Sequence, residues 1–267
     1  MLSGTRCAVL GSPIGHSRSP AMHRRAYAEL GLDWTYEAHE VDEAGLAPFL
    51  DGLDDRWRGL SLTMPLKRVA VGLVDEVSDR VRSVSALNTI VFDGGRRIGD
   101  NTDIPGVTAA LVERGIDDVR HAVVVGAGAT AASCLSALRA EGLRTATLVV
   151  RDPARASALA DMARCWGVDT AVSRLDEWRN DADLLVSTVP SEAVAAHAGQ
   201  WCERVGAVFD VIYDPWPTRL ASAAEAAGIP VASGLDLLAH QAALQVELMT
   251  GMSIDADLLR TAALGPG

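Results

Sequence analysis

The 267-residue sequence predicts an α/β protein with two domains, an N-terminal α/β domain and a second α/β domain built around a glycine-rich turn. Three observations predict this class. Hydrophobic residues make up 49% and charged residues 22% of the chain, which is typical of a globular protein. Short apolar runs alternate with helical segments, a pattern that favours parallel strands joined by helices. In the middle of the chain, a glycine-rich turn joins an apolar strand directly to a helix.

The first third begins with a predicted strand at Cys7–Leu10, which Gly11 and Pro13 end. Ser19 is the predicted N-cap of the next helix, with Pro20 at its first helical position, and Gly31 ends that helix after Leu30. Further along, the pattern predicts a strand, a helix and a strand at 34–41, 43–53 and 59–63. Strands that alternate with helices predict a parallel sheet.

The middle of the chain carries the strongest local pattern. The apolar strand Ala122–Val125 runs directly into Gly126-x-Gly128-x-x-Ala131, and a helix follows to Glu141. Glycines at these positions let a backbone approach a pyrophosphate, and the helix N-terminus attracts an anion, so the unit is typical of a dinucleotide-binding domain. An ordinary tight turn between strand and helix is the alternative. Later strands are predicted at 145–150, 184–187, 208–212 and 231–233, and final helices at 236–250 and 255–263.

The domain boundary is predicted near 101–105, where Gly94-Gly95 and the polar run Asp100–Asp103 interrupt the periodicity. This gives a first domain over 1–103 and a dinucleotide-binding domain over 104–235.

Charge and cysteine spacing exclude several classes of protein. The net charge of −11 disfavours nucleic acid as a partner, and no polybasic cluster would attract a membrane. The four cysteines lie far apart, without zinc spacing, so no metal site is expected. The N-terminal apolar run is too short for a signal peptide, so a cytoplasmic location is expected. The sequence leaves open whether the chain forms a homodimer.

The strand after the glycine turn indicates which dinucleotide would bind. NAD-binding domains usually carry an acidic residue at this strand end, whereas here Arg151 and Arg155 follow it. Guanidinium groups suit a 2′-phosphate, so NADP is the expected cofactor. Asp152 complicates this, because its carboxylate could repel the phosphate or pair with Arg155. Arg155 could also be only a solvated charge on a helix.

Polar residues follow predicted strands in the first domain as well. Ser17 and Ser19 flank a helix start, which suits a carboxylate ligand but equally suits helix capping. Lys67 lies just past a strand. The Asn88-Thr89 and Asn101–Asp103 segments are typical of Asx turns, so their residues alone do not show a ligand site.

Seven motifs, taken together, resemble the shikimate dehydrogenase family. They occur in the family's order over nearly the whole chain, as GSPIGHSRSP at 11–20, SLTMPLK at 61–67, SALNT at 85–89, GDNTDIPG at 99–106, VGAGATA at 125–131, VIYDPWPT at 211–218 and SGLDLLAHQAALQVELMTG at 233–251. The resemblance implies a Rossmann-like cofactor domain and a C-terminal segment, 236–267, that returns to complete the first domain. It also implies reversible NADPH-dependent reduction of 3-dehydroshikimate to shikimate, a step toward chorismate and the aromatic amino acids.

The resemblance assigns roles to individual residues. Lys67 and Asp103 would be the catalytic pair. The substrate-binding residues would be Ser17, Ser19, Thr63, Asn88, Tyr213 and Gln241. The cofactor-binding residues would be Asp79, Gly126, Ala127, Gly128, Ala129, Thr130, Arg151, Arg155, Thr188, Ile212, Gly234 and Leu237.

The sequence departs from the family pattern at three places, all on the cofactor side. Ala129 stands where the family commonly has a glycine, Val150-Arg151-Asp152 replaces Asn-Arg-Thr, and Leu237 replaces a frequent Met. A quinate/shikimate dehydrogenase that uses NAD is the alternative within the class. A ligand-sensing regulator on the same fold is the alternative outside it. Such a regulator should have lost Lys67 or Asp103 and gained a DNA-binding segment, and the sequence shows neither change.

Overall fold

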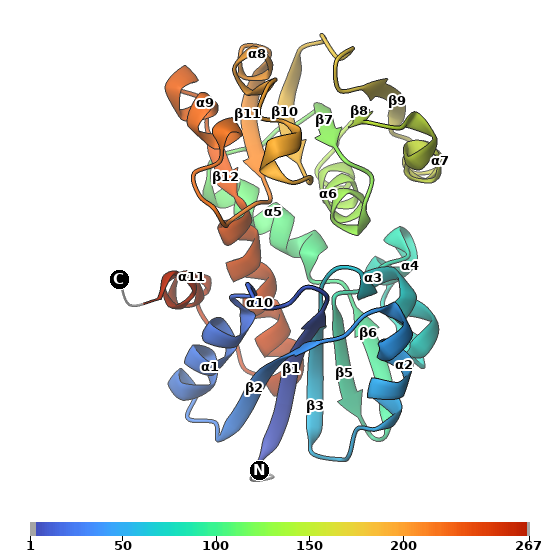
Figure 1. Ribbon diagram of the computed structural model, residues 1–267, viewed down its shortest axis with the longest axis vertical. Helices are drawn as coiled ribbons and strands as arrows, with labels where there is room; N and C mark the ends of the chain where they lie inside the picture. The colour runs from blue at the N-terminus through green and yellow to red at the C-terminus, as the bar shows by residue number, and fades with distance from the viewer. Residues whose placement is uncertain (1–3, 266–267) are drawn as a thin grey trace. The chain divides into compact units, whose positions relative to one another are not determined.

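The computed structural model describes residues 4–265, which form two compact units (Figure 1). The first unit comprises Met1–Gly106 and Leu238–Gly267, and the second comprises Val107–Leu237. The expected α/β class with a Rossmann-like second domain is confirmed, and the C-terminal helices belong to the first unit as the resemblance implied. Residues 1–3 and 266–267 of the expected first domain lie outside the described residues.

The first unit is built on a six-stranded sheet with the order β2-β1-β3-β5-β6-β4. The strands are β1 (Thr5–Gly11), β2 (Trp34–Glu40), β3 (Trp57–Leu62), β4 (Glu76–Val77), β5 (Thr89–Asp93) and β6 (Arg96–Asp100). The parallel arrangement predicted for the strands at 7–10, 34–41 and 59–63 is confirmed, but the sheet as a whole is mixed. β1 pairs in parallel with β2 and β3, and β4 with β6, but β5 runs antiparallel to both β3 and β6.

The antiparallel strands arise from a hairpin that the sequence prediction missed. Gly94 and Gly95 connect β5 to β6, and both have positive φ angles, +58° and +77°. Two consecutive residues with positive φ suit the twist of a two-residue hairpin turn, and glycine adopts them without strain. The two glycines therefore close a hairpin inside the first unit and do not mark the end of a domain.

Helices surround this sheet and complete the unit. They are α1 (Ser19–Glu29), α2 (Glu43–Asp51), α3 (Leu66–Val69), α4 (Asp79–Val84) and α11 (Ala256–Leu264), with a 3-10 turn at Ala70–Leu73. α1 packs beside β2 and α11 (Figure 1). The predicted N-cap of α1 is wrong by one residue, because Arg18 occupies the cap position and Ser19 is the first helical residue. The core on one side of the sheet gathers aliphatic side chains from β1, β3, α2 and α3, including Leu10, Leu46, Leu60 and Leu66.

The second unit holds a fully parallel sheet with the order β12-β11-β10-β7-β8-β9. Its strands are β7 (His121–Val125), β8 (Thr145–Val150), β9 (Asp169–Arg174), β10 (Ala182–Ser187), β11 (Val205–Asp210) and β12 (Val231–Ser233). The helices are α5 (Asp103–Glu113), α6 (Ala129–Ala140), α7 (Ser157–Cys165), α8 (Ala198–Cys202) and α9 (Arg219–Ala227), with 3-10 turns at Pro153–Ala156 and Ser191–Ala193. α10 (Gly234–Thr250) begins in this unit and lies mostly in the first. α5 and α10 each contribute residues to both units.

The strand order of the second unit reverses at β7, which lies between β8 and β10. In such sheets ligands bind beyond the carboxyl ends of the strands at this reversal. Gly126 follows β7 and Thr188 follows β10, so both lie at that point. Across residues 4–265, no helix is long and apolar enough to cross a membrane.

Candidate active site

Several polar residues of the first unit lie together at one edge of its sheet, where strands begin or end. β3 and β6 end at this edge and β5 begins there, because β5 runs antiparallel to both neighbours. Thr89 pairs with Asp100 in the hairpin, so Asn88 and Asn101 are the next residues beyond the paired strands. The backbone N–H of Asn88 donates to the carbonyl of Asp100 at 3.1 Å. Strand pairing thus brings together two segments that are well separated along the chain.

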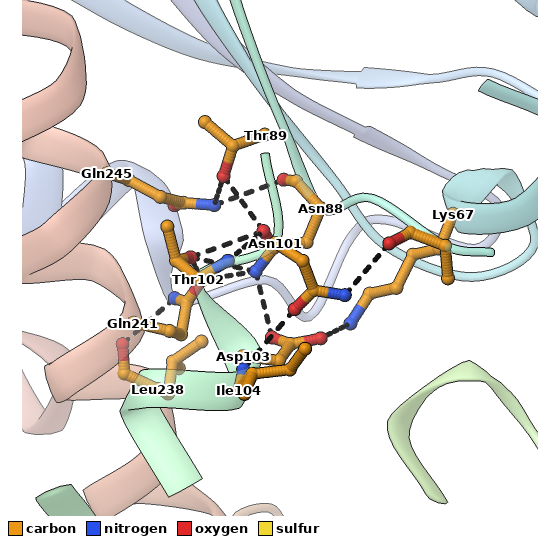
Figure 2. Close-up of polar contacts among 11 residues, drawn as sticks. Lys67, Asn88, Thr89, Asn101, Thr102, Asp103, Ile104, Leu238, Gln241 and Gln245 are labelled. Carbon is orange, nitrogen blue, oxygen red and sulfur yellow. Dashed lines mark hydrogen bonds and ion pairs between the residues drawn. The ribbon is translucent and has the colours of Figure 1, made fainter. Parts of the chain in front are cut away.

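Lys67 and Asp103 form an ion pair at this edge, with Nζ 2.6 Å from Oδ2 (Figure 2). Lys67 lies in the first turn of α3, and Asp103 is the first residue of α5. Their side chains are 15% and 6% exposed, so little water competes for the pair. An ammonium group held in this way can give a proton to a ligand oxygen, while the carboxylate keeps it oriented.

Backbone and side-chain contacts hold both members of the pair in place. The carbonyl of Lys67 accepts from the N–H of Leu87 at 2.8 Å. Asn101 donates through its side-chain amide to the carbonyl of Ala86 at 2.9 Å and accepts from the N–H of Ile104 at 3.3 Å. The second contact lies beside the start of α5, where helix N–H groups lack partners within the helix.

Asn88 connects the ion pair to its surroundings. Its Nδ2 lies 2.8 Å from Oδ1 of Asp103, 2.9 Å from Oγ1 of Thr102 and 3.3 Å from Oε1 of Gln241 (Figure 2). Its Oδ1 accepts from the N–H of Thr102 at 2.8 Å and from the Thr89 hydroxyl at 2.9 Å. Asp103 therefore accepts hydrogen bonds on both carboxylate oxygens, from Asn88 on one and from Lys67 on the other.

Gln241 reaches the same cluster from α10. Its Nε2 donates to the carbonyl of Leu238 at 2.9 Å, which leaves Oε1 facing Asn88 and Thr102. Lys67, Asn88, Asp103 and Gln241, four residues predicted from the sequence, thus form one group. Amides, a carboxylate and an ammonium together offer donors and acceptors suited to a ligand with several hydroxyl groups.

Ser17 and Ser19 follow β1, which neighbours β3. The Ser17 hydroxyl accepts from the N–H of Ser19 at 3.3 Å, while Ser19 is buried in the first turn of α1. This local hydrogen bond therefore uses part of the acceptor capacity of the Ser17 hydroxyl. Thr63 directly follows β3 and packs on Gly11, where a Cβ would lie 2.4 Å from Cγ2 of Thr63.

A second ion pair fixes the segment that precedes Asp103. Asp100 accepts two hydrogen bonds from the Arg80 guanidinium, at 3.1 and 2.6 Å, and one from the Ser78 hydroxyl at 2.6 Å. Burial acts to raise the pKa of Asp100, but the hydrogen bonds and charge of Arg80 outweigh it and hold the pKa below its usual value. Asp79, on the same helix as Arg80, is exposed and pairs with Arg82 at 2.6 Å.

The glycine turn of the second unit fits a dinucleotide. Gly126 has a φ of +110°, and a Cβ there would lie 2.4 Å from Oγ1 of Thr188, so a side chain cannot be accommodated. Gly128 is the N-cap of α6, and nothing lies within 4 Å of a Cβ added to it. The open approach and the start of a 12-residue helix suit a pyrophosphate. Ala127 lies in the turn, and Ala129 and Thr130 are the first residues of α6.

Arg151 and Arg155 lie exposed just after β8. The Asp152 side chain accepts from the N–H of Ala154 at 3.1 Å and caps the 3-10 turn at Pro153–Ala156. Asp152 therefore has a local structural role. Two guanidinium groups at a strand end can bind a phosphate through charge-assisted hydrogen bonds.

The loop after β11 carries Ile212 and Tyr213, because the strand ends at Asp210 and not at 212 as predicted. Asp210 accepts from the hydroxyl of Thr218 at 2.7 Å and from the N–H of Ile212 at 3.2 Å, so it holds both ends of the loop. Burial raises the pKa of Asp210 above its usual value. Gly234 approaches this loop closely, since a Cβ there would lie 1.9 Å from the carbonyl of Val211. Leu237 lies one turn further along α10.

Comparisons with known proteins agree with this geometry. Residues 9–90 match the family model for the shikimate dehydrogenase substrate binding domain, 110–207 the model for shikimate / quinate 5-dehydrogenase, and 234–264 the model for the shikimate 5'-dehydrogenase C-terminal domain. A shikimate dehydrogenase (NADP(+)) from Thermus thermophilus is 36% identical over 262 residues, 97% of each chain. The chain belongs to the shikimate dehydrogenase family.

Solved structures of shikimate dehydrogenases resemble the whole chain. The Mycobacterium tuberculosis enzyme matches with a TM-score of 0.90 and 38% identity, covering 98% of this chain and all of the other. A Thermus thermophilus enzyme, solved in complex with NADP(H) and shikimate, matches with a TM-score of 0.85 and 36% identity, covering 97% and 98% of the two chains.

The structure adds residues that the sequence analysis did not single out for this member of the shikimate dehydrogenase family. Thr89, Thr102 and Gln245 bond directly to Asn88 or its neighbours. Arg80 and Asp100 anchor the segment before Asp103. A sequence signal existed for Gln245, because it lies four residues after Gln241 and so on the same face of a helix. Among residues 4–265, no group of three or more His, Cys, Asp or Glu side chains could hold a metal ion.

Proposed function

We propose that this chain is an NADP-dependent shikimate dehydrogenase, which catalyses the reversible reduction of 3-dehydroshikimate by NADPH and a proton to shikimate and NADP⁺. The family models and the near full-length relatives support the activity and the cofactor. The buried ion pair between Lys67 and Asp103 is the structural observation that carries the proposal. It supplies an acid/base group beside amides that suit a polyhydroxylated ring.

Lys67 acts on the oxygen at C3 of the substrate. In the direction of reduction its ammonium gives a proton to that oxygen, and in oxidation its neutral amine takes the proton back. Asp103 holds Nζ at 2.6 Å and orients it. NADPH, when bound, supplies the hydride that reaches C3.

The other predicted residues bind substrate in this proposal. Ser17 and Ser19 hold the carboxylate, and Thr63, Asn88 and Gln241 hold the ring hydroxyls, with Tyr213 as a further substrate contact. Hydroxyls and amides can both donate and accept, so they can bind hydroxyl groups in either direction.

The glycine turn and α6 hold the pyrophosphate of NADP, and Arg151 and Arg155 hold the 2′-phosphate. Thr188, Ile212, Gly234 and Leu237 line the nicotinamide. Asp79 has the weakest structural support, because its side chain is exposed and pairs with Arg82 on its own helix, and its role stays a prediction.

A steady-state assay tests the function. The purified chain is given shikimate or quinate, each with NADP or NAD. Shikimate with NADP should give the highest kcat/KM, and a preference for quinate with NAD would replace the proposal with the alternative within the class. The cytoplasmic location stays a prediction. Whether the chain forms a homodimer, which the sequence leaves open, is tested by light scattering coupled to gel filtration.

A further inference from the structure

A chain of buried hydrogen bonds runs from the core of the first unit to Asp103. The phenol of Tyr36 donates to Ser61 Oγ at 2.6 Å, and the Ser61 hydroxyl donates to Oε1 of Gln245 at 2.8 Å. Nε2 of Gln245 donates to Thr89 Oγ1 at 3.0 Å, and the Thr89 hydroxyl donates to Asn88 Oδ1 at 2.9 Å. Asn88 then donates to Asp103 (Figure 2). Tyr36, Ser61, Gln245, Thr89 and Asn88 are all buried.

The direction of the chain is set by a single carbonyl group. Nε2 of Gln245 lies 3.1 Å from the backbone carbonyl oxygen of Asn88, which can only accept a hydrogen bond. Gln245 must therefore turn its NH₂ group to this carbonyl and to Thr89, and its oxygen to Ser61. The amide nitrogen of Gln245 cannot accept, so the proton of the Thr89 hydroxyl points to Oδ1 of Asn88.

Tyr36 lies at the far end of this series of hydrogen bonds, and its phenol acts as a donor to Ser61. Burial holds the pKa of Tyr36 well above its usual value, so the phenol keeps its proton. The ring of Tyr36 stacks on His23 with ring centroids 4.0 Å apart, which fixes its orientation. Ser61 Oγ accepts the hydrogen bond from Tyr36, so the Ser61 hydroxyl donates its own hydrogen bond to Oε1 of Gln245.

Gln245 also holds α10 against the sheet. It lies one helical turn after Gln241, and both side chains reach the segment Asn88-Thr89. Gln241 faces the side chain of Asn88, while Gln245 binds the main chain of the same residue. A rotation of α10 that moved Gln241 would have to break the bonds of Gln245 to β3 and β5.

We propose that Gln245 is a positioning residue for the reaction, and that with Thr89 it keeps Asn88 turned as a donor toward Asp103 and keeps Gln241 at the substrate. Thr102 supplies Asn88 with a second donor through its backbone N–H. The loss of Gln245 or Thr89 should therefore weaken the arrangement without abolishing activity. This inference rests on the proposed function for its kinetic test.

The kinetic test uses paired variants. Gln245→Met keeps the length of the side chain and removes its hydrogen bonds, and we expect kcat/KM for shikimate to fall about 10- to 100-fold. Thr89→Val should cause a similar fall, whereas Thr89→Ser, which keeps the hydroxyl, should stay within about threefold of wild type. Ser61→Ala and Tyr36→Phe should have progressively smaller effects. KM for NADP should not change in any of them.

Thr170→Val is the matched control, because it also removes a buried threonine hydroxyl, one that donates to the carbonyl of Val168 in the second unit. If Gln245 had a purely structural role, Gln245→Met would have a lower thermal stability than wild type, but its kcat/KM for shikimate would stay near wild type. That result, or equal losses in Thr89→Ser and Thr89→Val, would overturn the inference.

A spectroscopic test is independent of activity. In protein labelled with ¹⁵N on asparagine and glutamine side chains, the NH₂ signals of Asn88 should shift in Thr89→Val and in Gln245→Met but not in Thr89→Ser. Unchanged signals in all three variants would overturn the inference. If the wild type lacked activity on shikimate while these shifts occurred, the proposed function would fail and the positioning of Asn88 would stand.

Discussion

The candidate sites of the two units differ in what they offer a ligand: the first offers mainly side chains and the second mainly backbone. In the first unit the candidate site consists of buried side chains that bond to one another, such as Lys67, Asn88 and Asp103. In the second unit the glycine turn offers mainly backbone, with Gly126 and Gly128 leading into α6 and two exposed arginines beyond. A site built from interlocked side chains depends on each residue type, whereas a backbone site depends on space and φ angles. A substitution should therefore do damage in the first unit by removing a bonding group, and in the second by adding a side chain to a glycine.

The largest effect should come from Lys67 and Asp103, the proposed catalytic pair. Lys67→Ala should lower kcat by about 10² to 10⁴, or roughly 3–5 kcal/mol in the barrier, because the positioned acid/base group is lost. Asp103→Asn should also lower kcat, and the double variant should be little worse than the poorer single one. The check is kcat and KM for all three, with shikimate binding measured by calorimetry. A Lys67→Ala enzyme with more than about a third of wild-type kcat would contradict the mechanism.

Acid should destabilise the first unit through His23. This ring is fully buried, and burial lowers its pKa from 6.5 to about 4, although Nδ1 lies 3.0 Å from the carbonyl of Ser19. The unfolded chain therefore binds a proton below pH 6.5 that the folded chain does not bind until about pH 4. Lowering the pH from about 7.5 to 5 should therefore lower the free energy of unfolding by about 2 kcal/mol.

Urea unfolding at the two pH values measures this cost. His23→Phe should lose stability at the higher pH but show a smaller drop on acidification than wild type. His121→Asn, at an exposed position, should keep the wild-type drop. An equal drop in wild type and His23→Phe would show that other groups govern the acid sensitivity.

Two glycine variants probe the backbone site. Gly126→Ala places a Cβ 2.4 Å from Thr188 Oγ1 at a φ of +110°, so we expect about 1–3 kcal/mol of destabilisation together with weaker NADP binding. Gly128→Ala meets nothing within 4 Å, so its melting temperature should stay near wild type while KM for NADP rises. Differential scanning calorimetry and cofactor titration separate the two. Normal NADP affinity in Gly128→Ala would argue against a pyrophosphate at this turn.

The serines at the start of α1 should have smaller effects on substrate. Ser17→Ala and Ser19→Ala should each raise KM for shikimate. The rise should correspond to roughly 1–2 kcal/mol of binding free energy, the value of a hydrogen bond to a charged group, and KM for NADP should stay unchanged. If both variants kept wild-type KM, the role of Ser17 would be limited to accepting the local hydrogen bond from the N–H of Ser19.

Cofactor choice should depend on the exposed arginines. We expect kcat/KM with NADP to exceed that with NAD by at least about tenfold, or about 1.4 kcal/mol. Arg151→Ala should lose activity with NADP and keep it with NAD, because NAD lacks the 2′-phosphate. Equal use of both cofactors by the wild type would refute the assignment.

The sequence predicted the second unit better than the first. A glycine turn between a buried strand and a helix is a local pattern, and Gly126, Gly128 and β8 lie where it placed them. The hairpin β5–β6 went unnoticed because Gly94-Gly95 was interpreted only as an interruption of the periodicity before a domain boundary near 101–105, although a glycine pair between apolar runs is also a hairpin signal. Without that hairpin the sequence offers no physical reason for Asn88 to lie beside Asp103.

The residues of the candidate site were predicted mainly through family resemblance. Lys67, Asn88, Asp103 and Gln241 do form one bonded group, but they come from four separate segments. Spacing along the chain cannot reveal such a group, because strand pairing and the docking of α10 create it. The supporting residues Thr89, Gln245 and Arg80 were missed for the same reason.

The tight turn at Gly94-Gly95 offers a place for protein engineering. Both glycines are exposed, and nothing lies within 4 Å of a Cβ added to either. The five-residue strands on each side span about 17 Å, which separates the turn from Asn88 and Asp103. A short tag or fluorescent label inserted between the two glycines should therefore leave the ion pair undisturbed. The hairpin that brings the residues of the candidate active site together would then also carry a reporter at its opposite end.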